Sequence, residues 1–484
     1  MLNVKLVYKV IGSLLFLEAM FLAVCFGVSL TYLEDDTMAF IVSFVITILG
    51  GILFRYLGRD ANNSLGRRDA YLLVTLTWIV FSLFGSLPFM VSGYLVNPTD
   101  AFFETISGFT TTGASVISDV EVLPHGLLFW RSLTQWIGGL GIVFFTIAII
   151  PSLVGGNVKV FAAEATGPIR AKMHPRLTTT AKWIWSIYLM ITVGCALSFY
   201  AFGMGFFDCL NYSMTITATG GFAPHNESTG YFRNIGIDYS SILFMFLSGT
   251  SFTLLYTSVF KGRITQLLRN SEFKLYCSLI VIGTLVIGGC LMAYEGYSPA
   301  RSLRVSLFQV VSFITTTGVF NDDASVWPHV TWVILCLLAF IGGCSGSTSG
   351  GFKCIRGAMA FRIMQNEIKR ILHPKAVLPV KVNDITIPYS AQVTLLAFFA
   401  VYFLLCFVAF TIMIAAGVDT TNSVCIALSC ACNVGPSLDV IGPVMSWADL
   451  PMLVKWVLSA LMLMGRLEIF SVIVLFTHSF WKDR

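Results

Sequence analysis

Apolar residues dominate ten stretches of the chain, and charged residues gather in the segments between them. A helix that crosses a bilayer needs about 20 apolar residues, and most of these stretches approach that length. The pattern therefore predicts ten membrane spans, at about residues 10–32, 38–54, 71–91, 127–150, 183–202, 241–260, 275–294, 330–341, 393–416 and 453–476. The eighth stretch is short for a span and runs into a glycine-rich segment.

The composition supports this interpretation. Of the 484 residues, 56% are hydrophobic and only 11% are charged, whereas soluble domains carry roughly 25% charged residues. A water-soluble protein is excluded, and so is a disordered one, which needs low hydrophobicity and high net charge. The 12 cysteines lie mostly within apolar runs and form no CxxC motif, so we expect no zinc or redox site. The chain is predicted to be an all-α polytopic membrane protein.

The distribution of basic residues predicts the orientation of the spans. Cytoplasmic loops are enriched in Lys and Arg, so Lys5 and Lys9 place the N-terminus inside. With ten spans, 24 of the 30 Lys and Arg fall in inside segments, while the outside is acidic. Both termini are therefore predicted to be cytoplasmic. A cleaved signal peptide is the alternative, but the first apolar stretch exceeds the usual core of about 7–15 residues and contains Glu18.

Four short apolar pieces lie between spans and are too short to cross the membrane themselves. They end in Thr-Thr-Thr-Gly113, Ala-Thr-Gly-Gly221, Thr-Thr-Thr-Gly318 and Asn-Val-Gly435. In the second piece either Gly220 or Gly221 could be the equivalent glycine. Spacing favours Gly221, because a hydroxyl residue stands six positions before the glycine in the other pieces, as Thr215 does here. Thirteen positions before three of these glycines stand polar residues that we expect to cap the short helices, namely Asp100, Asp208 and Asn422.

This self-similarity predicts the domain organisation. Each unit consists of a span, a short pore helix, a glycine-containing filter loop and a second span. The predicted fold has four such repeats around a central pore, together with an N-terminal pair of helices. We expect an N-terminal two-span domain at residues 1–69 and pore repeats at residues 70–180, 181–273, 274–390 and 391–484.

The four loops have the chemistry of a cation filter. Non-helical backbone at membrane depth is tolerated only where it is buried in protein or lines a water-filled cavity. Backbone carbonyls in such a place replace the hydration shell of an ion, and glycine permits the dihedrals that aim them. Acidic residues at the outer mouth, such as Asp119 and Asp322, are expected to concentrate cations. The predicted filter comprises Thr110, Thr111, Thr112, Gly113, Ala218, Thr219, Gly220, Gly221, Thr315, Thr316, Thr317, Gly318, Asn433, Val434 and Gly435.

With these motifs, and over essentially its whole length, the chain resembles the Trk/Ktr/HKT superfamily of potassium transporters. One Thr-Thr-Gly is weakly specific, whereas four related loops in register are specific. The loops usually keep one glycine, whereas potassium-channel filters carry two. The resemblance implies K⁺ as the bound and transported ion, held at Thr111, Thr112, Thr219, Gly220, Thr316, Thr317, Asn433 and Val434.

A glycine- and serine-rich segment follows the eighth apolar stretch. Such a composition does not make a stable helix interior, since each Gly costs about 1 kcal/mol relative to Ala. A phosphate loop is excluded by the absence of the GxxxxGK[ST] pattern, and an ordinary cytoplasmic linker is the alternative. Its depth favours an intramembrane loop, and the family resemblance implies a gate below the filter. The predicted gate residues are Gly342, Gly343, Ser345, Gly346, Ser347, Thr348, Ser349, Gly350 and Gly351.

Arg466 is a further gate candidate, because it lies within the last predicted span. It stands 15 residues after Pro451, and the same offset from the corresponding prolines gives Gly139 and Gly343. A charged residue inside a membrane normally faces protein or water. We expect Arg466 to project into the pore as a positive barrier. An ion pair with Glu468 is the alternative, although residues two apart point to different faces of a helix.

The predicted function is potassium uptake across the bacterial inner membrane, through either a channel-like or a symporter mechanism. The alternatives are a Na⁺-permeable or Na⁺-coupled member of the same superfamily and a secondary transporter of another class, which would carry inverted repeats. A membrane enzyme is set aside because the six His residues are scattered and no catalytic motif occurs. The resemblance implies a homodimer and a cytosolic TrkA-like nucleotide-binding ring subunit that docks on basic segments 159–182 and 353–381. Besides these partners we expect only the lipid bilayer, and no nucleic acid.

Overall fold

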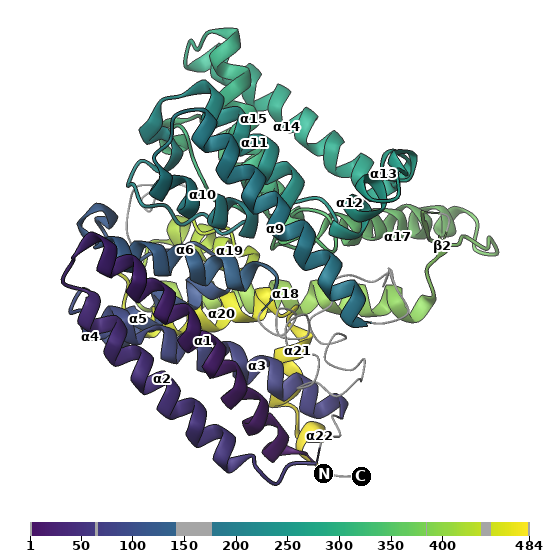
Figure 1. Ribbon diagram of the computed structural model, residues 1–484. Helices are drawn as coiled ribbons and strands as arrows, with labels where there is room; N and C mark the ends of the chain where they lie inside the picture. Colours follow the sequence, from purple (N-terminus) through teal and green to yellow (C-terminus); the bar gives the residue numbers. More distant parts are fainter. Residues whose placement is uncertain (1, 63–65, 142–176, 384, 437–446, 483–484) are drawn as a thin grey trace.

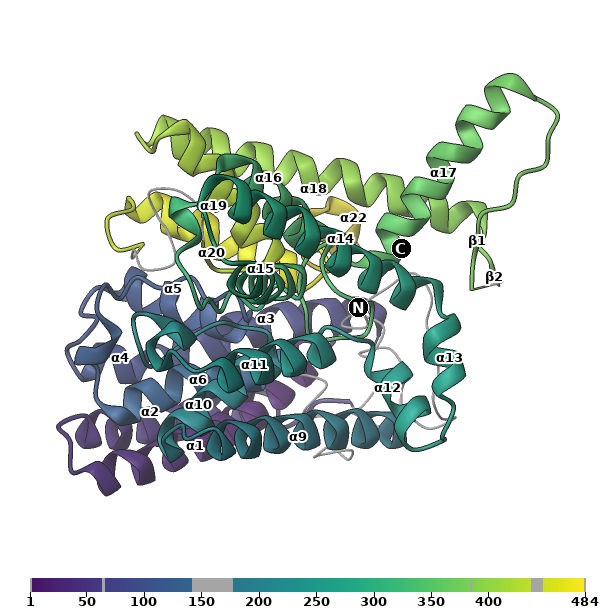
Figure 2. The same cartoon turned by 90° about the horizontal axis from the view of Figure 1, so that it is seen from above.

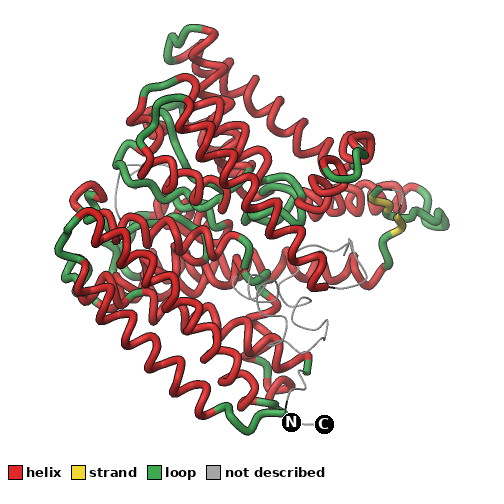
Figure 3. Tube along the Cα trace, viewed as in Figure 1, coloured by secondary structure: helices red, strands yellow, loops and turns green. Residues whose placement is uncertain are grey.

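The structure is a computed structural model that describes residues 2–62, 66–141, 177–383, 385–436 and 447–482. Throughout this part of the chain the secondary structure is almost entirely helical (Figure 3). The predicted N-terminal domain contains a helical pair, α1 (Val4–Tyr32) and α2 (Thr37–Leu57), which pack against each other along the edge of the molecule (Figure 1). Buried Leu14, Phe40 and Trp130 link this pair to the helices that follow.

The four expected repeats each contain a short helix between longer ones. In repeat 1 these are α3 (Arg67–Gly85), α4 (Leu87–Val91), α5 (Pro98–Phe109), η1 (Val120–Val122) and α6 (His125–Gly139). In repeat 2 they are α9 (Leu177–Ala201), α10 (Phe206–Ala218), η2 (Ser228–Phe232), α11 (Ile235–Ser248), α12 (Phe252–Val259) and α13 (Ile264–Arg269).

The second half of the chain continues this pattern. Repeat 3 contains α14 (Ser271–Tyr294), α15 (Pro299–Ile314), η3 (Ala324–Val326), α16 (His329–Ile341) and α17 (Cys354–Leu372). Repeat 4 contains α18 (Tyr389–Ala415), α19 (Thr420–Cys432), α20 (Met452–Arg466), α21 (Phe470–Ile473), η4 (Val474–Phe476) and α22 (His478–Trp481).

Six helices in the described part of the chain are long and apolar enough to cross a membrane, or eight if two bent pairs each count as one crossing. The protein is therefore a predominantly helical membrane protein with several apolar spans. Of the ten predicted spans, the fourth extends into residues 142–176, outside the described residues, and the eighth is only the 13-residue α16.

Two spans that we predicted as continuous helices are broken. The stretch 241–260 bends by 102° between α11 and α12, and the stretch 453–476 bends by 111° between α20 and α21. Hydrogen bonds from a distant loop stabilise the first break, because the Gly249 carbonyl accepts from Cys344 N at 2.9 Å and Phe252 N donates to the Gly346 carbonyl at 3.0 Å. At the second break, Glu468 and Ile469 both have positive φ, which ends the helix.

Two smaller expectations also need correction. Residues Asp100, Asp208 and Asn422 are not N-caps but the third residues of their helices, since α5, α10 and α19 begin two residues before each of them. The all-α expectation misses a two-stranded hairpin, β1 (Lys381–Val382) with β2 (Ile385–Thr386). This hairpin lies beside the start of α18, after a loop that returns from the far end of the projecting helix α17 (Figure 2).

Candidate ion-conducting pore

The four short helices α5, α10, α15 and α19 end in the same way. In each, a non-glycine residue adopts a left-handed conformation with φ of 53–56°, at Thr111, Thr219, Thr316 and Asn433. The next N–H then bonds to the carbonyl five residues back, and these bonds are Thr112 to Ser107, Gly220 to Thr215, Thr317 to Ser312 and Val434 to Ser429, at 2.8–3.0 Å. This Schellman-type end satisfies helix carbonyls and turns the chain sharply. The hydroxyl residues that stand six positions before each glycine thus supply the backbone carbonyls that accept these hydrogen bonds.

Two residues further on, each loop carries a glycine with positive φ. These glycines are Gly113, Gly221, Gly318 and Gly435, with φ of 74–93°. Few L-residues adopt this conformation, so glycine is strongly favoured there. Gly221, and not Gly220, is the equivalent residue in repeat 2, which is the register that the spacing predicted.

The same glycines join the four loops into a closed ring. A Cβ atom added at any of them would collide with a backbone carbonyl of the next repeat. The pairs are Gly113 with Gly220, Gly221 with Thr317, Gly318 with Val434, and Gly435 with Thr112. Repeat 1 therefore contacts repeat 2, repeat 2 contacts repeat 3, repeat 3 contacts repeat 4, and repeat 4 contacts repeat 1. The predicted filter residues are all buried apart from Gly113 and Gly221, which are partly exposed.

Side chains reinforce the ring between repeats. Asn433 Nδ2 donates to Thr112 Oγ1 at 2.9 Å and to the Met462 carbonyl at 3.0 Å, which ties repeat 4 to repeat 1. Within repeats 1 and 3, hydroxyl pairs Thr110–Thr112 and Thr315–Thr317 lie 2.8 and 2.7 Å apart. Oxygen atoms from carbonyls and hydroxyls thus gather where the C-terminal ends of four helices meet. This arrangement suits a cation, since helix C-termini carry partial negative charge.

A cavity of about 80 Å³ lies against all four ring glycines. Neither Asp119 nor Asp322 lines it, contrary to our expectation of an acidic outer mouth. Asp119 instead accepts a hydrogen bond from Asn226 Nδ2 at 2.8 Å, and Asp322 lines a separate pocket of about 520 Å³. Neither carboxylate therefore belongs to the lining of the cavity at the ring.

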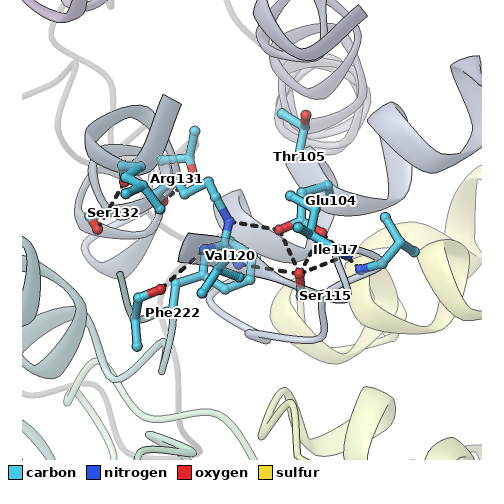
Figure 4. Close-up of polar contacts among 12 residues, drawn as sticks. Glu104, Thr105, Ser115, Ile117, Val120, Arg131, Ser132 and Phe222 are labelled. Carbon is cyan, nitrogen blue, oxygen red and sulfur yellow. Dashed lines mark hydrogen bonds and ion pairs between the residues drawn. The ribbon is translucent and has the colours of Figure 1, made fainter. Parts of the chain in front are cut away.

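Sequence reasoning missed a buried ion pair beside this cavity (Figure 4). Arg131 Nε lies 2.9 Å from Glu104 Oε1, and their side chains are 3% and 0% exposed. Ser115 Oγ donates to Glu104 at 3.0 Å, and Arg131 Nη1 donates to the Ala223 carbonyl at 3.2 Å. The guanidinium also stacks on the Phe222 ring at 4.2 Å. The sequence feature that could have indicated this pair is the presence of Glu104 and Arg131, of opposite charge, within apolar segments.

The predicted gate residues form a loop that contacts the ends of three pore helices. Gly350 N donates to Thr316 Oγ1 at 2.6 Å, and Gly351 N donates to the Cys432 carbonyl at 2.9 Å. Thr348 Oγ1 donates to the Thr217 carbonyl at 3.1 Å. Repeats 2, 3 and 4 all contribute to this seat, so the loop lies directly against the filter turns.

The rest of the gate loop is fastened to neighbouring elements. Gly343 accepts from Cys354 N at 3.0 Å, Ser345 N donates to Glu272 Oε1 at 2.5 Å, and Ser347 Oγ donates to the Cys344 carbonyl at 2.6 Å. Gly342, Gly346 and Gly351 have positive φ, which permits the loop's reversals. Ser349 accepts from the buried Lys353 Nζ.

Arg466 connects the gate loop to repeat 1. Its guanidinium donates to the carbonyls of Thr348 at 2.8 Å, Gly138 at 2.7 Å and Gly139 at 2.7 Å. Glu468 pairs with a different residue, Arg356, at 2.5 Å. The alternative of an Arg466–Glu468 pair is therefore not the arrangement found, and Arg466 instead holds the gate loop through backbone oxygens.

Lys353 is a second basic residue at the gate that sequence reasoning did not identify. We had assigned it to the basic inner segment 353–381. Its side chain is buried, its backbone has φ of 77°, and its Nζ donates to the carbonyl of Ser349. Its only sequence signal is its position directly after the glycine-rich segment.

The chain matches the family model described as TrkH, cation transport protein, over residues 36–483. The Trk system potassium uptake protein TrkH of Halomonas elongata is 37% identical, covering 99% of this chain and 100% of the relative. The protein of the same description from Escherichia coli K12 is 36% identical over the whole of both chains. The crystal structure of the potassium transporter TrkH from Vibrio parahaemolyticus has a TM-score of 0.89 and 34% identity, covering 99% of this chain and 100% of that one.

Proposed function

Because the chain belongs to the TrkH family of cation transport proteins, we propose that it takes up K⁺ through the ring formed by its four filter loops. It is a multi-pass membrane transporter and not an enzyme. The observation that carries the proposal is the closed ring of glycine–carbonyl contacts from repeat 1 through repeat 4 and back. A ring of carbonyls can replace the hydration shell of K⁺. The oxygens proposed to bind it belong to Thr111, Thr112, Thr219, Gly220, Thr316, Thr317, Asn433 and Val434.

The gate in this proposal is the loop 342–351, held by Arg466. Its contacts with Thr316, Cys432 and Thr217 support a position directly below the filter. K⁺ would pass only when the loop leaves this seat. The cytoplasmic orientation of both termini and the location in the bacterial inner membrane belong to the same proposal. They rest on the preference of Lys and Arg for the inside.

The partners are also part of the proposal. The relatives are components of Trk systems, which supports the existence of other Trk subunits. We assign a homodimer and a TrkA-like nucleotide-binding ring on the cytosolic side. The segment 353–381 would dock that ring, because it carries α17 away from the other helices (Figure 2). The other expected docking segment, 159–182, lies largely outside the described residues.

Ion flux in liposomes tests the proposed function. The purified protein should conduct K⁺ in preference to Na⁺, and each tenfold of preference corresponds to about 1.4 kcal/mol. Equal fluxes would favour the Na⁺-permeable alternative. A K⁺ flux that requires an inward proton gradient would favour symport over a channel. Absence of K⁺ flux under any gradient would contradict the proposal.

A further inference from the structure

Repeat 2 departs from the other repeats at the position before the ring glycine. That position holds Thr112, Thr317 and Val434 in three loops but Gly220 in repeat 2. The φ of Gly220 lies outside the left-handed region, so its backbone does not require glycine. The missing side chain therefore needs another explanation.

The space beside Gly220 is occupied by the side chain of Gln135 from α6 of repeat 1. A Cβ atom at Gly220 would lie 2.5 Å from Gln135 Oε1 and 2.9 Å from Nε2, both too close for any real contact. Gln135 is itself fully buried. The amide of one repeat thus fills the place that a side chain of the loop itself would take.

The Gln135 amide also bonds to the filter backbone on both sides of Gly221. Nε2 donates to the Gly220 carbonyl at 2.7 Å, and Oε1 accepts from Phe222 N at 3.1 Å. Among the four carbonyls that meet the ring glycines, the one of Gly220 accepts this side-chain hydrogen bond from a neighbouring repeat. Both the direction of this carbonyl and part of its accepting capacity are set by Gln135.

A second side chain on the same face of α6 also fixes the repeat-2 filter loop. Arg131 precedes Gln135 by one helical turn, so the two residues project to the same side. Arg131 donates to the Ala223 carbonyl and stacks on Phe222, while Glu104 fixes its guanidinium (Figure 4). Residues 220–223 of repeat 2 are therefore held at both ends by repeat 1.

We propose that Gln135 is a specificity-determining residue, which takes the place of the missing side chain at Gly220 and positions the repeat-2 carbonyl for K⁺. This inference rests on the proposed function. The residues at the same offset after Pro328 and Pro451 are Ala339 and Met462, neither of which can donate a hydrogen bond from its side chain. The filter is thus asymmetric, because the Gly220 carbonyl of the ring is oriented by a hydrogen bond from the Gln135 amide.

The first test compares two buried amides. Gln135→Ala should lower the ratio of K⁺ to Na⁺ flux in liposomes by roughly fivefold, equivalent to about 1 kcal/mol. Gln309→Ala is the matched control, because Gln309 is equally buried but donates to the Asp322 carbonyl, which is not one of the ring carbonyls. The control should keep the wild-type ratio. A wild-type ratio in Gln135→Ala would overturn the inference while leaving the proposed function standing, whereas a wild-type protein without K⁺ preference would overturn the proposed function.

The second test asks whether Gln135 and residue 220 share one space. Gly220→Thr alone should lose selective K⁺ flux, because the new side chain meets the Gln135 amide. Adding Gln135→Ala should recover much of that ratio, because the threonine can then adopt the place that Thr112 and Thr317 take in their own loops. Effects that simply add would overturn the claim of a shared space. Thermal unfolding of each variant checks that it is folded, and each flux is divided by the amount of folded protein.

Discussion

Arg466 is the residue whose contacts most directly link the gate to the rest of the pore. Its three hydrogen bonds join the Thr348 carbonyl to those of Gly138 and Gly139. Arg466→Ala should therefore raise ion flux severalfold, since each 1.4 kcal/mol removed from a barrier gives about tenfold in rate. Selectivity should stay unchanged, because the carbonyls of Thr348, Gly138 and Gly139 to which Arg466 donates are not those that meet the ring glycines.

Arg356→Ala is the control for this residue. Arg356 is buried, and it pairs with Glu468 and donates to the Phe352 carbonyl, just beyond the gate residues. Removing it leaves the partly buried Glu468 carboxylate without this partner, which destabilises the folded protein. Its yield should fall without a gain in flux per folded molecule. Unchanged or lower normalised flux in Arg466→Ala would reject its role in the gate.

Single residues differ in how far the sequence reveals their part in the site. The ring glycines could be predicted, because a backbone conformation that disfavours other residues recurs at a fixed spacing. The roles of Gln135 and Lys353 could not be predicted. Gln135 contacts Gly220, which is 85 positions away, and Lys353 contacts the Ser349 carbonyl only because the gate loop is folded. The helix caps were predicted three residues late. For Asp100 and Asp208 the reason is that acidic residues also favour the first turn of a helix.

Among the elements, the gate loop connects several parts of the pore. It contacts the ends of three pore helices and also holds the break between α11 and α12. Shortening the stretch from Gly346 to Gly350 should prevent the loop from reaching Thr316 and should raise flux in liposomes. Deletion of Gly296 is the control, because this outer-loop glycine has open surroundings. A shortened loop with wild-type conductance would contradict the gate assignment.

The two broken spans illustrate what periodicity does not encode. The apolar composition continues through residues 241–260 and 453–476, so hydropathy alone predicts straight helices. The first break persists because the gate loop supplies hydrogen bonds to Gly249 and Phe252. Irregular backbone at membrane depth is tolerated when protein satisfies it. The gate loop that supplies these hydrogen bonds is about 95 residues away in the sequence, so no local sequence pattern predicts the break.

At the scale of the whole molecule, the filter exists only when all four repeats are assembled. Each ring glycine contacts a carbonyl from the next repeat, and the contact between Gly435 and Thr112 closes the ring across most of the chain. The repeat pattern in the sequence predicts equivalent loops, but closure depends on packing between them. The account therefore predicts that crowding any one ring glycine disturbs ion selection as a whole.

The most direct test measures the ratio of K⁺ to Na⁺ flux for Gly113→Ser against Gly93→Ser. Both glycines have nearly the same φ, 83° and 84°, so the backbone strain of the substitutions is matched. A side chain at Gly113 meets the Gly220 carbonyl, whereas at Gly93 nothing lies within 4 Å. We predict that Gly113→Ser lowers the ratio by about tenfold, or about 1.4 kcal/mol, and that Gly93→Ser keeps the wild-type value. Equal ratios in the two variants would contradict the assignment of the ring as the K⁺ filter.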